Sequence, residues 1–194
     1  MPPVQYHYHY CRSTLVYQTD IPREKLDKML NMEYQDITSR VLNRNKKNYK
    51  VVEQQYYIDE NGNRYNVDGK NVIMKHTEKE KEVAKILGEI YGGKVKLIPA
   101  VLNPQHIKTP DYMLRNMKFD LKEPTGSSKT TIYDLFKHKS KQADNFIIDI
   151  HKSGLDKLEC IEQTQKLFYS SHRKWINTVI LMEDNEIFKV LKRQ

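Results

Sequence analysis

The most regular pattern of hydrophobic and polar positions begins at Thr77 and ends at the glycine pair Gly92-Gly93. Four apolar residues recur there at helical spacing: Val83, Ile86, Leu87 and Ile90. Thr77 and Glu80 precede them in the order of an N-cap residue and a capping-box glutamate, and glycine commonly follows the last turn of a helix. The segment is therefore predicted to be a helix.

After this helix, short segments with strand character alternate with longer helical ones. The predicted strands are residues 94–99, 111–114, 118–122, 146–150, 177–182 and 187–191. The predicted helices are residues 131–145 and 155–175. Arg115-Asn116 and Asp184-Asn185 provide turns between two pairs of these strands. This order predicts an α/β fold with a mixed central sheet flanked by helices.

The first third of the chain is less regular. It is predicted to be an α+β extension of residues 1–65, joined to a main domain of residues 66–194. Its apolar spacing and turn signals predict a helix at 21–44 and a hairpin with strands 54–59 and 64–67. Asp68-Gly69 marks a second turn, which leads into a predicted strand at 71–75.

The first 20 residues are rich in Tyr and His and show no clean period. His7 and His9 alternate with tyrosines, as in a short strand or an extended arm. Metal binding by these two histidines is the alternative. Cys11 and Cys160 lack the spacing of metal ligands, and a reducing compartment is expected.

The formal net charge of +8 is unevenly spread. Residues 1–70 hold 11 Lys/Arg against 9 Asp/Glu, whereas residues 71–194 hold 22 against 16. A basic domain suits a polyanionic partner such as nucleic acid, because lysines and arginines displace counterions from phosphates. The alternative is a solvated Lys/Glu surface. No apolar run approaches the ~18 residues of a membrane span, so no membrane partner is expected.

Two aspartates and a lysine stand on the predicted hairpin 111–122. Asp111 follows a proline, and Asp120 and Lys122 lie two apart on one strand, so they project from the same face. Carboxylates suit Mg²⁺, which neutralises phosphate charge and activates water, and an adjacent lysine can stabilise the developing charge. The pattern indicates a metal-dependent phosphodiester hydrolase. The alternative is a surface ion pair.

These residues carry a family resemblance. The order helix, three strands, helix, strand, with TPD and FDLKE on the second and third strands, resembles the PD-(D/E)XK nuclease core, the fold of restriction endonucleases. The segments TPDYMLRNMKFDLKEPTGSSKTTI and KSKQADNFIIDIHKS are similar to the C-terminal tRNase domain of contact-dependent growth inhibition (CdiA-type) toxins. The resemblance covers about residues 66–194. It implies hydrolysis of tRNA in the bacterial cytoplasm.

The resemblance also implies a metal site. Its two aspartates fall on Asp111 and Asp120. Its helix glutamate falls most simply on Glu82, and the other candidates on the same helix are Glu78, Glu80 and Glu89. These three carboxylates would hold a divalent ion, with Mg²⁺ expected and Mn²⁺ or Zn²⁺ as alternatives.

Two lysines compete for the catalytic role. Lys122 fits the general PD-(D/E)XK pattern, and Lys139 fits the toxin pattern. Lys139 also falls on the inward apolar face of the predicted helix 131–145, where an ammonium group needs carboxylates or water. The alternative is that Lys139 extends to solvent at the end of the helix.

Several polar residues are candidates for binding the substrate. Lys129 and Thr130 lie in a small-residue loop that could hold a phosphate, Gln142 lies close to the inward face of the next helix, and Arg173 and Lys174 adjoin Trp175. Solvation of the helix surface is the alternative for Gln142, and a place in the core is the alternative for Trp175.

We therefore expect a bacterial toxin domain with RNase activity. A cognate acidic immunity protein is the expected protein partner. HYHYCRSTLV resembles a segment of phage minor head proteins, which implies delivery as part of a larger phage or secreted protein. The alternatives are a DNA endonuclease on the same scaffold, a non-catalytic phage structural or nucleic-acid-binding protein, and a metal-independent RNase.

Overall fold

The computed structural model describes residues 33–43, 48–137 and 142–194. The chain divides into two compact units, Met1–Met32 and Glu33–Gln194. Expectations for residues 1–32, which include His7, His9, Cys11 and the phage-like segment, lie outside the described residues, as does Lys139. The fold described below is that of the second unit.

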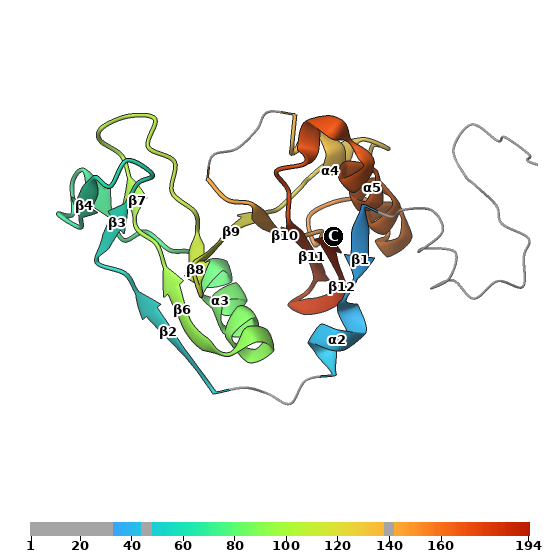
Figure 1. Ribbon diagram of the computed structural model, residues 1–194, viewed down its shortest axis with the longest axis horizontal. Helices are drawn as coiled ribbons and strands as arrows, with labels where there is room; N and C mark the ends of the chain where they lie inside the picture. Colours follow the sequence, from blue (N-terminus) through green and yellow to red (C-terminus); the bar gives the residue numbers. More distant parts are fainter. Residues whose placement is uncertain (1–32, 44–47, 138–141) are drawn as a thin grey trace, which may run out of the picture. The chain divides into compact units, whose positions relative to one another are not determined.

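One mixed sheet of eight strands organises this unit (Figure 1). In spatial order its strands are β1 (Tyr34–Asp36), β12 (Glu186–Arg193), β11 (Thr178–Glu183), β10 (Asn145–Asp149), β9 (Met117–Lys122), β8 (Tyr112–Leu114), β6 (Gly93–Leu97) and β2 (Tyr49–Glu53). The neighbours β9, β10 and β11 are parallel, and β8 runs antiparallel to both β9 and β6. The predicted fold class, a mixed central sheet flanked by helices, is confirmed.

Helix α3 (Glu78–Tyr91) covers one face of the sheet. Thr77 accepts a hydrogen bond from the backbone N–H of Glu80, and the Glu80 carboxylate accepts one in return from the Thr77 backbone, which completes the predicted capping box. The apolar side of the helix packs against alternate strand residues, including Val95, Tyr112 and Phe119. In each strand, the residues that alternate with these apolar positions therefore point to the opposite face of the sheet.

The other face is covered over β10 to β12 by α4 (Thr131–Asp134) and α5 (Lys157–Tyr169), followed by a single 3-10 turn at Ser171–Arg173. The Phe146 ring on β10 packs edge-to-face against Phe136 and Trp175, with centroids 4.8 and 5.6 Å away. Every residue of β10 is buried, because a central parallel strand is covered on both sides. Trp175 therefore takes the predicted alternative role in the core.

Two small two-stranded sheets accompany the main one. Strands β3 (Tyr56–Ile58) and β4 (Arg64–Asn66) form the predicted hairpin, and β5 (Val72–Ile73) pairs with β7 (Ala100–Val101). Together they bury a second apolar cluster formed by Tyr57, Val72, Ile98 and Val101, against which Met113 of β8 packs.

The N-terminal boundary differs from the prediction. The expected boundary between residues 65 and 66 lies inside the second unit, because β1 and β2 extend the main sheet at its two edges. Residues 34–36, expected to be helical, pair instead with β12. Within residues 33–43, the described part of the predicted helix 21–44, the helical residues are those of α2 (Thr38–Leu42). Free backbone groups at a sheet edge are satisfied by an added strand, which here outweighs local helical spacing.

The expected helix 131–145 is also much shorter in the structure. Helix α4 ends at Asp134, and Asn145 already belongs to β10. Phe136 lies in a turn after α4, and its ring packs against Phe146 of β10.

Candidate active site

The two candidate aspartates lie opposite each other across the β8–β9 hairpin. Arg115 and Asn116 form its turn with φ angles of 50° and 65°, and the register pairs Tyr112 with Phe119. One step further from the turn, Asp111 faces Asp120. The Asp111 Oδ2 accepts a hydrogen bond of 2.6 Å from the backbone N–H of Leu121, which holds its carboxylate against β9.

Burial raises the pKa of both carboxyl groups, and the charge of Asp120 adds to the rise at Asp111. Asp120 is 1% exposed. Burial, followed by the charge of Asp120, raises the pKa of Asp111 from 3.8 to about 7. Burial also raises the pKa of Asp120, although Lys122 and a hydrogen bond with the Asp111 carboxyl group oppose the rise. Strongly shifted carboxyl groups that share one site are characteristic of catalytic and metal-binding positions.

Lys122 lies on the same side of β9 as Asp120, as predicted for residues two apart on a strand. Its ammonium group forms an ion pair with Asp120 Oδ2, and its side chain is 28% exposed. Lys122 is therefore held beside the carboxylate pair and is still accessible to a bound anion.

Among the glutamates of α3, Glu80 is the one whose charge acts on the aspartate pair. The charge of Glu80 contributes to the raised pKa of both Asp111 and Asp120. Glu82 is exposed, and its carboxylate accepts a hydrogen bond of 3.2 Å from Asn185 in the β11–β12 turn. The capping box explains the difference: it fixes Glu80 in the first turn of α3, whereas Glu82 follows two positions later on another side of the helix.

A buried ion pair anchors the first turn of α3 to the sheet. Asp149 ends β10 with a fully buried side chain, and its Oδ2 pairs with the ammonium of Lys79. Lys79 also donates a 2.8 Å hydrogen bond to Asn185. Sequence reasoning missed this pair, and the one available signal was a carboxylate inside the otherwise apolar segment FIIDI. It holds the turn that carries Glu80.

Two carboxylates, those of Asp111 and Asp120, are the groups in this site that could bind a cation. Among the described residues, no group of three or more His, Cys, Asp or Glu side chains comes together to hold a metal ion. Asp111 and Asp120, however, carry more negative charge than their buried setting favours, which is the condition that a divalent cation relieves. The donor set therefore fits a cation held by this pair, with further ligands from water or the substrate, as is usual for Mg²⁺.

The remaining predicted site residues are dispersed. Lys129 and Thr130 are exposed, and Thr130 donates a 3.0 Å hydrogen bond to Asp134. Arg173 is 5% exposed and donates to the Tyr133 hydroxyl at 2.6 Å, so it supports the core and is not open to a substrate. Lys174 is exposed and Gln142 is half-buried.

The sheet face that carries the aspartates is also basic over β2, β6 and β9. The strand registers place five lysines on the side opposite α3: Lys50, Lys94, Lys96, Lys118 and Lys122. Lys50 and Lys94 are exposed, and the others are partly exposed. A positive surface beside a carboxylate pair suits a phosphate backbone that passes over the pair.

Neutralising Asp111 should change how stability depends on pH. A raised pKa in the folded protein means that the stability associated with protonated Asp111 is fully present below about pH 4 and is lost as the pH rises through about 7. Asp111→Asn remains neutral and can still accept the Leu121 hydrogen bond. Thermal unfolding should therefore show the variant matching the parent near pH 4 and melting several degrees higher near pH 8.

Asp111→Asn also tests whether the aspartate pair binds a divalent cation. Millimolar MgCl₂ or MnCl₂ near pH 8 should raise the unfolding temperature of the parent and leave that of Asp111→Asn unchanged. Equal responses of the two proteins would show that the aspartate pair does not bind the ion.

Comparison with known proteins supports the resemblance. Residues 108–187 match the family model described as "Contact-dependent growth inhibition CdiA C-terminal domain". The matched segment contains Asp111, Asp120 and Lys122 and ends in β12, while α3 lies before it. The predicted similarity to this toxin domain is confirmed, and the PD-(D/E)XK assignment stays a prediction.

A solved structure, "CdiA-CT/CdiI toxin and immunity complex from Burkholderia pseudomallei", is also similar. It matches with a TM-score of 0.46 and 19% sequence identity, over 74% of this chain and 99% of that one. No curated protein matches the chain. In the part of the chain that the structure describes, none of the helices is long and apolar enough to cross a membrane.

Proposed function

We propose that this chain is a toxin domain that hydrolyses phosphodiester bonds in RNA, with tRNA as its substrate, in the cytoplasm of a bacterial target cell. The observation that carries the proposal is the pair of half-buried Asp111 and buried Asp120, held face to face beside Lys122 on a basic surface. The family match over these same residues supports a toxin role. The choice of RNA over DNA rests on that similarity.

Each group in the site has a chemical task. Asp111 and Asp120 would hold a divalent cation, which would supply charge neutralisation at the phosphate and a more acidic water. Lys122, once drawn from Asp120 by a bound phosphate, places its ammonium where negative charge develops on the phosphoryl oxygens. Glu80 adds negative charge to the surroundings of the pair, while its carboxylate accepts the Thr77 backbone hydrogen bond that caps α3.

Incubation of the purified protein with tRNA or with plasmid DNA tests the proposal. Cleavage of tRNA that needs Mg²⁺ or Mn²⁺ and stops in EDTA is expected, with the plasmid left intact. Plasmid cleavage alone would indicate a DNA endonuclease on the same scaffold. RNA cleavage that persists in EDTA would indicate a metal-independent RNase, and the absence of any cleavage would favour a non-catalytic protein.

A cognate immunity protein is proposed as the protein partner. Its expected character is acidic, because the surface beside the site carries the lysines Lys50, Lys94, Lys96 and Lys118. Expression of the chain alone should arrest bacterial growth and degrade tRNA. Co-expression with the product of the adjacent gene should restore growth and protect tRNA. If it does neither, and the two proteins do not bind each other, that protein is not the immunity partner.

A further inference from the structure

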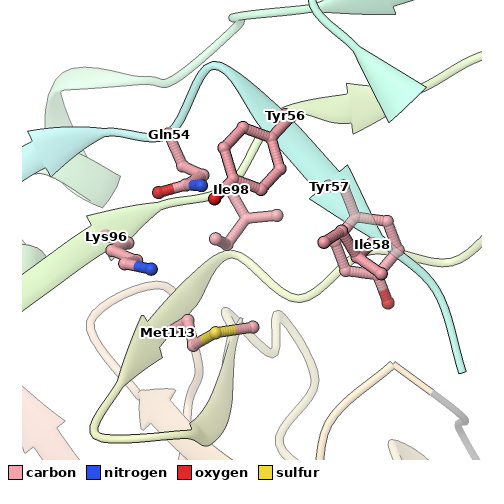
Figure 2. A pocket seen from close by; sticks show the side chains of 7 residues that line it. All are labelled: Gln54, Tyr56, Tyr57, Ile58, Lys96, Ile98 and Met113. Atoms are coloured by element: carbon pink, nitrogen blue, oxygen red, sulfur yellow. The ribbon is translucent and has the colours of Figure 1, made fainter. Parts of the chain in front are cut away.

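Figure 2 shows a pocket beside β6 and β8. By strand alternation, its lining residue Met113 lies on the same face of the sheet as Asp111. The volume of the pocket is about 170 Å³. Its floor is formed by Ile98 and Met113, and the register pairs Met113 with Lys96. Ile98 donates its backbone N–H to the carbonyl of Asp111 at 3.0 Å, so the pocket floor and the candidate site are cross-strand neighbours.

The spacing between pocket and site follows from strand geometry. Met113 lies two residues beyond Asp111 on the same face, which corresponds to about 7 Å along an extended strand. A phosphate at the aspartate pair and a base in the pocket could therefore belong to adjoining nucleotides. The pocket is too large for a single water, whose share of liquid volume is about 30 Å³, and it can admit a planar ring.

The lining combines aromatic and apolar walls with two polar groups. Figure 2 shows the Gln54 amide and the Lys96 ammonium on one side, and Tyr57 and Ile58 on the other, with Tyr56 along the rim. Ile58 is 47% exposed, so it lines the part of the pocket that opens to solvent. The amide can pair with the edge of a base, and the ammonium can meet its phosphate.

Contacts within its own hairpin hold the aromatic wall in place. The Arg64 guanidinium lies over the Tyr56 ring at 3.8 Å from its centroid. The hairpin that carries both tyrosines is closed by Asp59, which accepts hydrogen bonds from Asn61, Asn63 and Tyr65 at 2.9 to 3.0 Å. A preformed stacking surface loses little conformational entropy on binding.

We propose that this pocket holds an unpaired base of the nucleic acid cleaved at Asp111 and Asp120. The inference rests on the proposed function and adds a specificity for single-stranded or looped substrate. Stacking on a tyrosine is sequence-tolerant, whereas Gln54 can discriminate among bases. Lys96, which lines the pocket, supplies the positive charge that a nucleic acid needs and that an apolar ligand would not.

Binding is measured in the inactive Asp120→Asn protein, so that cleavage does not interfere. Fluorescence anisotropy with a labelled single-stranded RNA should give a dissociation constant about 5- to 100-fold weaker after Tyr56→Ala, while Tyr56→Phe retains the parent affinity. Tyr169→Ala, which removes a 53% exposed tyrosine on α5, should change nothing. An oligonucleotide that carries abasic sites should bind Tyr56→Ala and Tyr56→Phe alike.

Two outcomes overturn the proposal. If Tyr56→Ala and the parent bind RNA with equal affinity, and thermal unfolding shows that both are folded, the pocket does not bind a base. RNA cleavage by the active protein would then still support the proposed function. A loss of affinity on Lys96→Met alone shows that the surface binds phosphates only. If the parent neither binds nor cleaves RNA or DNA, the proposed function fails instead, and an affinity of this pocket for the immunity protein is left as its role.

Discussion

Asp120→Asn should lower the rate of nucleic-acid cleavage by at least about 100-fold while the protein stays folded. The substitution keeps the shape of a side chain that is 1% exposed and removes its charge. The aspartate pair therefore loses one of the two carboxylates that would bind a cation. It also frees the Lys122 ammonium from its partner. Cleavage of labelled tRNA at saturating protein gives the rate constant directly.

The control for this result is an aspartate outside the site. Asp134→Asn changes a carboxylate on α4 that pairs with exposed Lys137 at 3.3 Å, and it should cleave at the parent rate. Growth arrest in bacteria should follow the same order, lost with Asp120→Asn and retained with Asp134→Asn. Full activity of a folded Asp120→Asn protein would falsify the proposed chemistry.

Lys79→Met should reduce the free energy of unfolding by about 3 kcal/mol, because it leaves the Asp149 carboxylate buried without its cation. Lys79 is itself 25% exposed, so the lower end of the range for broken buried pairs applies. For a domain of this size that loss corresponds to a fall of about 6–12 °C in the unfolding temperature. Differential scanning calorimetry near neutral pH measures it.

A matched lysine on the same helix gives the comparison. Lys81 pairs with exposed Glu78 at 2.8 Å, and Lys81→Met should change the unfolding temperature by about 1 °C or less. Adding Asp149→Asn to Lys79→Met should recover part of the loss, because it removes the unpaired charge. Equal effects of Lys79→Met and Lys81→Met would show that the buried pair does not anchor α3.

The sequence predicted the hairpin of the site well, because every signal for it is local. Alternation of apolar residues, a two-residue turn and a pair of flanking aspartates lie within one segment of twelve residues. A β-hairpin joins residues that are close in the chain, so its register follows from its turn. The face-to-face position of Asp111 and Asp120 followed from that register.

The assignment of the helix glutamate could not be made in the same way. Glu80 and Glu82 both lie on α3, and their order in the chain does not say which one reaches a hairpin some thirty residues further on. The structure shows the partners of each side chain: Lys79 pairs with Asp149, Glu80 closes the capping box, and Glu82 accepts a hydrogen bond from Asn185. The pocket was also hidden, because it combines a hairpin assigned to the N-terminal extension with strands of the main sheet.

By itself, the sequence determined the class of fold, the capped helix, the hairpin and the two aspartates, because hydrophobic period, capping and turn chemistry act over a few residues. Only the tertiary structure decided that β1 and β2 complete the sheet, that α4 stops after one turn, and that the pocket lies beside Asp111. These features depend on which distant segments share a buried surface, and the free energy of that burial is not encoded in any local pattern.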